Sequence, residues 1–417
     1  MSCLNKKKGK STVVLYGKTI AYKMICVVLG FLSSILINRC LGVALRGEYT
    51  VITNWASLLQ LFLNLGIGTA YPAIKRRNAE RGKAVFSTVT LCMVGLYMLS
   101  AAILFPFVDI AVKYIIAIAF ITAVENLLIF IAVIEDVSLR NVINIITSCI
   151  HIFILLIIFF WLPKNINAVL FAIIVDHLVL CCSFIMLYKV QVLDFSLLDR
   201  KIMREILAIA MPAMLMNILM YLNYHADVLF LSVITKSNIE VGLYGTAVTL
   251  GNMLWIVPDA FKDILYNRAT KKDNPDEIIL AIVSNFIICI IIFIGFTLLG
   301  KWFLNLMYGK EYVAAYSIVL MLFVGTLPMV LYKLIHPIYI VNGKTNIVVI
   351  ALATAVISNF VGNLVLIPRL GGMGAAIASV ISYSLCGIVF YRKFTNDYSV
   401  NMLSSVKIMM RKIKKML

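Results

Sequence analysis

The sequence predicts an all-α protein that crosses a membrane with about twelve helices. Its 417 residues are 62% hydrophobic and only 13% charged, whereas soluble domains are about half apolar and about a quarter charged. The apolar residues form blocks as long as Val142–Leu162, and a run of roughly 20 apolar residues spans the hydrocarbon core as a helix. Strands of a membrane barrel would instead alternate apolar and polar residues over about ten positions, and the sequence has no such alternation.

Successive apolar blocks define the predicted helices, because irregular backbone facing lipid is too costly. They lie near 13–37, 48–74, 84–108, 112–134, 142–162, 168–189, 206–233, 244–268, 278–300, 313–340, 347–367 and 371–391. The N-terminal MSCLNKKKGK resembles the start of a signal peptide. The apolar run after it continues without a small-residue cleavage site, so we expect an uncleaved first span. Pro106 and Asp109 mark the turn between the third and fourth spans.

The positions of Lys and Arg set the predicted orientation. With the N-terminus in the cytoplasm, the cytoplasmic segments hold 26 of the 37 Lys and Arg residues, the opposite face holds eight, and three lie within spans. Because basic residues accumulate on the cytoplasmic side, both termini are predicted to be cytoplasmic.

The formal charge of +18 would also suit a nucleic-acid-binding protein, but the placement of the charges argues against it. The basic residues cluster in short segments between apolar blocks, whereas nucleic acid needs a basic face on a folded soluble domain. The nine cysteines form no CxxC or Cys/His spacing. We therefore expect no nucleic acid, no metal and no cofactor.

An internal repeat is indicated at an offset of 195 residues. RGEYTVITNWASLL (46–59) aligns with VGLYGTAVTLGNML (241–254), chiefly through Gly47 with Gly242 and Tyr49 with Tyr244. Both stretches lie at the outer entrance of the second span of a half, which favours a parallel repeat of two six-helix lobes. Chance similarity between two apolar helices is the alternative.

The repeat divides the chain into predicted domains: an N-terminal lobe at 1–189, a cytoplasmic linker at 190–205, a C-terminal lobe at 206–395 and a basic tail at 396–417. The tail has apolar residues at helical spacing with Lys and Arg between them, as in an amphipathic helix on the inner leaflet. A disordered tail that only enforces topology fits equally well.

Several stretches resemble the polysaccharide or O-antigen flippases of the multidrug/oligosaccharidyl-lipid/polysaccharide (MOP) superfamily. The pattern R-x-LG-x-x-x-x-G-x-Y is matched by Arg39, Leu41, Gly42, Gly47 and Tyr49, with Val43 where the family commonly has Pro. Further matches are NLGIGTAYP (64–72), VGLY (241–244), YGKEYVAAYSIVLML (308–322), VNGKTN (341–346) and IPRLGGMGAAIASVIS (367–382). The resemblance covers nearly the whole chain.

The resemblance implies a fold like that of multidrug (MATE) exporters and lipid II flippases, with two lobes around a central cavity and alternating access. The implied cargo is a polyprenyl-diphosphate-linked oligosaccharide, moved from the inner to the outer leaflet of the bacterial cytoplasmic (inner) membrane for O-antigen, lipopolysaccharide or capsule synthesis. The implied partners are this carrier, membrane lipids and a polysaccharide polymerase. H⁺, Na⁺, voltage and a substrate gradient all remain open as energy sources.

Ionisable residues inside spans are the candidate site, because a charge at the bilayer centre costs about 2.5–3.5 kcal/mol on insertion scales. Lys23 lies about ten residues into the first span. Its ammonium would attract the diphosphate of the carrier in a water-filled cavity, which the family's basic cavity also implies. A Lys paired with a carboxylate on a neighbouring helix is the alternative.

The other deep candidates lie in the second half of the chain and in the fourth span. His225 and Asp227 are two residues apart, so they point to different sides of their helix, and His225 could bind phosphate or titrate near neutral pH. Lys333 and His336 share a helix face between Pro328 and Pro337, two prolines that could break the helix.

Glu125 lies in the other lobe at a depth similar to that of Lys333 and His336. Its carboxylate could hold the two lobes together by pairing with one of these bases, or it could bind a coupling ion. Burial within its own lobe, paired with Asp176 or His177, is the alternative.

Four further basic residues lie near the span ends. Arg39 and Arg46 at the outer edge suit headgroup anchors or an outer gate, and Lys262 and Arg268 at the inner end could attract the diphosphate on its way in. Topology alone would also explain the last two.

Other function classes fit less well. The sequence has no GxSxG, HExxH or P-loop motif, and no external segment large enough for a sugar-transfer site. A glycan polymerase or ligase, or a structural membrane protein without transport, is therefore a weaker interpretation than a transporter. A drug exporter of the same superfamily is closer, but such exporters more often need acids in the cavity, whereas the deep charges here lean basic.

The predicted orientation places 75–83 and 189–204 in the cytoplasm and 301–312 outside. In a chain without its native cysteines, an impermeant thiol reagent applied to intact cells should label a cysteine at position 308 and spare one at position 78. Labelling of position 78 from outside would overturn the assignment.

Overall fold

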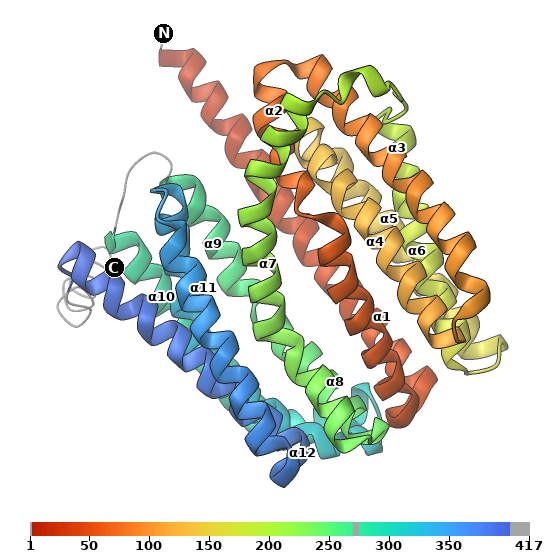
Figure 1. The fold of residues 1–417 in the computed structure, drawn as a ribbon. Helices are drawn as coiled ribbons and strands as arrows, with labels where there is room; N and C mark the ends of the chain where they lie inside the picture. The colour runs from red at the N-terminus through yellow and green to blue at the C-terminus, as the bar shows by residue number, and fades with distance from the viewer. Residues whose placement is uncertain (1, 270–274, 401–417) are drawn as a thin grey trace. The chain divides into compact units, whose positions relative to one another are not determined.

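The computed structural model describes residues 2–269 and 275–400, except for the side chains of 2–21, Lys23, Asp263 and 267–269. Within these residues the chain forms helices and no strand (Figure 1). The α-helices are α1 (Ser2–Asn64), α2 (Tyr71–Arg77), α3 (Ala79–Leu104), α4 (Ile110–Glu135), α5 (Val137–Trp161), α6 (Ile166–Leu187), α7 (Arg200–Thr235), α8 (Asn238–Leu254), α9 (Ile256–Ala269), α10 (Pro275–Met307), α11 (Tyr316–Val341) and α12 (Thr345–Tyr398). Short 3₁₀ turns lie at η1 (Ile67–Ala70), η2 (Phe105–Phe107), η3 (Phe195–Leu197) and η4 (Lys310–Ala315).

The predicted number of spans is confirmed. Ten helices among the described residues are long and apolar enough to cross a membrane. Two of them, Met24–Asn64 and Thr345–Tyr398, are each divided by a glycine with a left-handed φ, Gly42 at 66° and Gly371 at 54°. Undivided, the longer would measure about 80 Å at 1.5 Å per residue, far more than the roughly 30 Å hydrocarbon core. Each therefore supplies two spans, which makes twelve.

Two local expectations about the spans are wrong. The span predicted at 48–74 is interrupted at Leu65 and Gly66, both with positive φ, before η1 and α2. The span predicted at 244–268 is found as Asn238–Tyr266, with α8 and α9 meeting at Trp255. Conversely, α11 runs unbroken through Pro328 and Pro337, because neighbouring helices and local adjustments tolerate proline in membrane helices.

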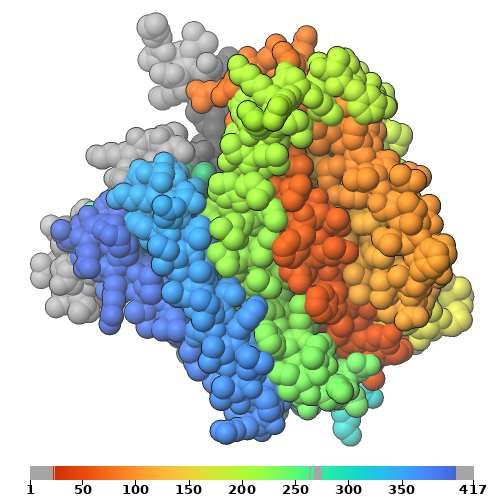
Figure 2. Space-filling model, viewed as in Figure 1, coloured from red at the N-terminus to blue at the C-terminus, as the bar shows by residue number. Residues whose placement is uncertain are grey.

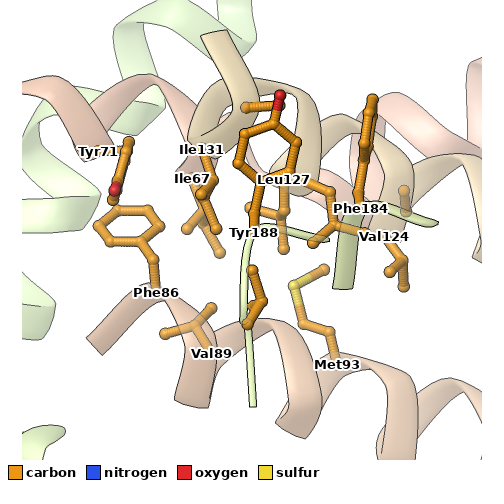
Figure 3. Packing of buried hydrophobic residues seen from close by; sticks show 14 of the residues in the cluster. Ile67, Tyr71, Phe86, Val89, Met93, Val124, Leu127, Ile131, Phe184 and Tyr188 are labelled. Carbon is orange, nitrogen blue, oxygen red and sulfur yellow. The ribbon is translucent and has the colours of Figure 1, made fainter. Parts of the chain in front are cut away.

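The described chain forms two compact units. Unit 1 comprises the chain up to Gly42 together with Ile52–Ile218, and unit 2 comprises Val43–Val51 together with the chain from Leu219 onward. The core of unit 1 lies between α2, α3, α4 and α6 (Figure 3). There the rings of Tyr71 and Phe86 are 5.0 Å apart, and Leu127, Ile131 and Phe184 are fully buried. Packing of this kind holds membrane helices together, since lipid is as apolar as the side chains.

Helix α11 is central to unit 2. It packs against α8, α9, α10 and α12, and its side chains from Met329 to Tyr339 are mostly buried. Its closest neighbour is α12: the two helices lie side by side in Figure 2, and a Cβ on Gly387 would collide with the backbone carbonyl of Pro328.

A reciprocal backbone contact within unit 2 follows the repeat. A Cβ on Gly47 would collide with the carbonyl of Asn238, and a Cβ on Gly242 would collide with the carbonyl of Val43. The 195-residue offset relates Gly47 to Gly242 and Val43 to Asn238. Each contact therefore repeats the other with the two halves of the sequence interchanged. Such reciprocity is what a two-fold axis produces. The same offset carries the break at Gly42 onto Ser237, between α7 and α8.

The segment predicted as a linker packs on α3. Ser87 Oγ donates to the Val192 carbonyl and accepts from the Val192 N–H, both at 2.8 Å, and Arg81 lies 3.2 Å from Asp199. The lobe boundaries at 189 and 206 stay predictions. Of the predicted tail, residues 401–417 lie outside the described part of the chain.

The glycine contact generates a stability prediction. Gly47→Ala or Gly242→Ala should lower the midpoint of thermal unfolding by about 5 °C or more, because a methyl group at either position forces two backbones apart. Gly30→Ala and Gly95→Ala are matched controls, since nothing lies within 4 Å of a Cβ at either site and alanine favours a helix by about 1 kcal/mol. Thermal unfolding of the detergent-purified variants measures the effect. Equal midpoints for all four variants would contradict the contact.

Candidate functional site

The charged groups deep in unit 2 meet at Asp259 of α9. Lys333 Nζ of α11 lies 2.9 Å from Asp259 Oδ1 and 3.0 Å from Oδ2, and Lys262 Nζ lies 3.1 Å from Oδ1. Lys333 is 8% exposed. A buried ammonium needs such a counter-charge, because its desolvation costs several kcal/mol. The cluster holds two positive charges and one negative charge.

Aromatic rings flank the buried ammonium. Lys333 Nζ is 4.7 Å from the ring centroid of Trp255 and 5.6 Å from that of Tyr224, both within cation–π range. Trp255 is the residue at which α8 and α9 meet. The junction of the two helices therefore places a ring beside the charge.

His336 lies one turn beyond Lys333 on α11. Its ring stacks on Tyr332 with centroids 4.7 Å apart, and its Nδ1 is 3.0 Å from the Tyr332 carbonyl. Because a carbonyl only accepts, Nδ1 is the donor, and Nε2 is left as an acceptor in the neutral ring.

The cluster is suited to holding an oxyanion reversibly. Lys262 is the more accessible base, with 32% of its side chain exposed against 10% for Lys333. An incoming phosphate would meet Lys262 first and would then compete with Asp259 for both ammonium groups. When no anion is bound, Asp259 keeps Lys333 paired.

Asp227 of α7 forms a separate polar centre in unit 2. The carboxylate is 1% exposed and accepts hydrogen bonds from the Tyr244 hydroxyl, from Ser379 Oγ at 2.7 Å and from the Val228 N–H at 2.9 Å. Its neighbour in the prediction, His225, instead stacks on Tyr221 with centroids 4.7 Å apart. The two residues lie in different surroundings, as their spacing predicts.

Glu125 has its partner within unit 1. Its Oε2 lies 2.5 Å from His177 Nδ1, which joins α4 to α6. This is the within-lobe pairing that the sequence left open. Lys333 likewise has its acid partner within its own unit, at Asp259.

The four basic residues near the span ends have different surroundings. Arg46 is 6% exposed, its Nη2 donates to Thr249 Oγ1 at 3.3 Å, and its guanidinium lies 4.6 Å from the Tyr49 ring centroid. It is therefore buried rather than facing headgroups, whereas Arg39 is exposed. Lys262 belongs to the Asp259 cluster. The side chains of Lys23 and Arg268 lie outside the described residues.

A pocket of about 580 Å³ opens at the break in α12. It is lined by Thr235, Glu240, Ser317, Arg369 and the residues around Gly371. Glu240 Oε2 accepts from the Gly372 N–H at 3.2 Å, so an acid caps the helix that resumes after the break.

Asp259 is the functional candidate that sequence reasoning missed. It lies in the predicted eighth span three residues before Lys262, a spacing at which helical side chains pair. A search of every span for acids as well as bases would have found it. Its bond to Lys333, 74 positions along the chain, has no signal in one sequence.

Comparisons with known proteins identify the chain's relatives. A family model described as "Polysaccharide biosynthesis protein" matches residues 16–257, more than half of the chain. No curated protein sequence is significantly similar.

Solved structures share the fold. The lipid II flippase MurJ in an inward closed conformation is similar at a TM-score of 0.72 and 14% identity, over 96% of this chain and 91% of that one. An inward-facing multidrug resistance MATE family transporter of the MOP superfamily reaches a TM-score of 0.69 at 16% identity, over 92% of this chain and 96% of that one. The eukaryotic MATE transporter AtDTX14 reaches 0.59 at 15% identity, over 96% and 99%. The predicted fold class is confirmed.

The Asp259 cluster generates a second stability prediction. Asp259→Asn alone should cost about 3–5 kcal/mol, because it leaves the buried Lys333 ammonium without this counter-charge, whereas Lys333→Met should cost less, since Asp259 keeps Lys262 at 3.1 Å. The double variant should be more stable than Asp259→Asn alone. Thermal unfolding across this double-mutant cycle measures the coupling.

The control is Lys301→Met, which removes an exposed ammonium of α10 that lies 5.3 Å from the Tyr316 ring centroid. It should leave stability nearly unchanged. Additive losses in the cycle would show that the two charges do not stabilise each other.

Proposed function

The chain belongs to the polysaccharide biosynthesis protein family, in the MOP superfamily, and from that premise we propose that it is a flippase and not an enzyme. It moves a polyprenyl-diphosphate-linked oligosaccharide repeat unit from the inner to the outer leaflet of the bacterial cytoplasmic membrane by alternating access. The exported unit passes to a polysaccharide polymerase that builds O-antigen or capsule. The observation that carries the proposal is the family match over residues 16–257.

The fold is compatible with a lipid-linked cargo. Its solved neighbours include both a lipid II flippase and multidrug transporters, so fold alone leaves both classes open. The family match favours polysaccharide biosynthesis, and the resemblance to O-antigen flippases implies a saccharide carried on a lipid.

The charges inside the spans favour an anionic cargo over a cationic drug. Three intramembrane acids already have partners: Glu125 contacts His177, Asp227 contacts Tyr244 and Ser379, and Asp259 contacts Lys333 and Lys262. At these three acids a cationic drug would have to displace a partner. An anion could instead use the bases, since Lys262 and Lys333 share one carboxylate.

The diphosphate sets the requirement for the cavity. It carries about two negative charges, and even one bare charge at the bilayer centre costs about 2.5–3.5 kcal/mol on insertion scales. We assign Lys23 the first contact with the diphosphate inside the membrane, with Lys262 and Arg268 attracting it at the inner end. Lys333, His225 and His336 are further binding groups, and Arg39 and Arg46 form the outer gate.

Reconstituted vesicles test the function and Lys23 together. In proteoliposomes carrying labelled polyprenyl-diphosphate oligosaccharide, an impermeant phosphatase added outside should cleave the whole label with wild-type protein, but only the outer-leaflet share in empty vesicles. Lys23→Ala should abolish the added cleavage, and Lys23→Arg should keep part of it, because the charge survives with another shape. Lys310→Ala, at an exposed lysine, is the matched control.

Two outcomes would reject parts of the proposal. Wild-type vesicles that extrude ethidium and leave the lipid-linked label inside would make the chain a drug exporter. A Lys23→Ala variant that exposes label at the wild-type rate would remove Lys23 from the substrate path and keep the function.

A further inference from the structure

Four titratable side chains meet halfway along three neighbouring helices of unit 1. Glu125 comes from α4, His151 from α5, and Asp176 and His177 from α6. Each lies near the middle of a predicted span, where charges are costly. Glu125 pairs with His177. The remaining acid, Asp176, and the remaining base, His151, face each other without a hydrogen bond.

The Asp176–His151 pair is incomplete. Asp176 Oδ2 lies 3.9 Å from His151 Nδ1, too far for a hydrogen bond. His151 is 7% exposed, and its Nδ1 has no hydrogen-bond partner among the described residues. In the neutral tautomer that carries its proton on Nε2, Nδ1 is a bare acceptor that faces the Asp176 carboxylate. Two acceptors form a hydrogen bond only when one of them takes up a proton.

The charge balance of the cluster favours taking up that proton. With one proton shared between Glu125 and His177, that pair is neutral, and an ionised Asp176 beside a neutral His151 leaves one negative charge. One more proton, taken from water, neutralises the cluster, whether it resides on the carboxylate or on the imidazole. A neutral cluster is the cheaper form inside a membrane.

The described neighbours of the cluster named below supply no compensating charge. Cys181 of α6 donates to the Ile121 carbonyl at 3.7 Å, and Tyr97 of α3 donates to the Leu63 carbonyl at 3.0 Å. Arg140, on α5, is eleven residues before His151, about 16 Å at the helical rise. Among these neighbours, therefore, none holds the second acid in its ionised form.

A metal ion fits this cluster poorly. The described residues contain no group of three or more His, Cys, Asp or Glu side chains arranged to hold one. Sodium and other hard cations prefer several oxygen ligands, whereas the open position here lies between one oxygen and one nitrogen.

We propose that Asp176 and His151, beside the Glu125–His177 pair, form a proton-binding site of unit 1 that couples lipid transport to the proton gradient. Binding of the proton draws His151 and Asp176 about 1 Å closer, into hydrogen-bonding distance, and part of this approach is a shift between α5 and α6. Cores repack in discrete steps rather than deforming smoothly, so such a shift can separate two states of the unit. The coupling rests on the proposed flippase function, and the proton site does not.

Nitrogen NMR of histidine-labelled protein tests the site directly. In the purified wild-type chain, His151 Nδ1 should change from a bare to a hydrogen-bonded or protonated nitrogen as the pH falls from about 8 to about 5. The Asp176→Asn variant should lose this transition. Asp109→Asn, the same change at an exposed residue of unit 1, should keep it. A His151 signal that stays constant over this range in the wild type would overturn the proposal, without reference to any variant.

The vesicle assay tests the coupling. With one proton moving inward for each lipid moved to the outer leaflet, a vesicle exterior more acidic by one pH unit should raise the ratio of outer-leaflet to inner-leaflet label by up to about tenfold. The Asp176→Asn variant should show no such dependence, and replacing Na⁺ by K⁺ should change nothing. A wild-type protein that flips lipid at the same ratio with and without the gradient would overturn the coupling. A wild-type protein that flips no lipid would reject the proposed function and leave the NMR test in force.

Discussion

Two stretches of backbone touch where the repeat brings Gly47 and Gly242 together, and this contact constrains the rest of unit 2. Any side chain larger than hydrogen at either residue would overlap a carbonyl on the opposite stretch. Because each glycine meets the partner residue that the 195-residue offset predicts, the contact is the place where the two halves of the sequence act as copies. Segment Val43–Val51 is continuous with the chain of unit 1 but packs in unit 2, and the breaks at Gly42 and Ser237 start both contacting stretches. Small residues have this effect in membranes because close backbone approach, and not exclusion from water, drives helix association.

The membrane also decides how the charges are arranged. A buried charge without a partner is costly, and two described intramembrane pairs each lie within one unit: Lys333 with Asp259, and Glu125 with His177. Each pair lowers the cost of burying its charges and can still exchange partners. A substrate anion or a proton that binds one member slightly more strongly than its resident partner does can displace that partner. In this way a modest binding energy can shift a conformational equilibrium.

How much of this could be predicted depended on whether the signal was local. The apolar runs specified twelve spans, and the predicted gaps at 38–47 and 368–370 contain Gly42 and adjoin Gly371, because span length is a property of a short stretch. The interruption at Leu65 and the intact helix through Pro328 and Pro337 were not predicted, since packing neighbours decide whether a helix tolerates a break. Lys333 and His336 were recognised as ionisable groups at depth, and Lys262 as a base at the inner end of its span. The common partner of the two lysines, Asp259, and the meeting of His151 with Asp176 required the three-dimensional arrangement of α9 with α11 and of α5 with α6.

The two units hold chemically different charged clusters, although the units follow one repeat. Unit 2 carries the ammonium groups of Lys262 and Lys333 around Asp259, and unit 1 carries the Glu125–His177 and His151–Asp176 pairs of imidazole and carboxylate. An ammonium group suits an anion such as a diphosphate, and the proposed function adds Lys23 of unit 1 to the same task. An imidazole facing a carboxylate suits an energy source that is itself a proton. A duplicated fold can therefore keep one backbone plan in both halves and still place the coupling site in one half alone, because only the side chains at mid-helix positions need to differ.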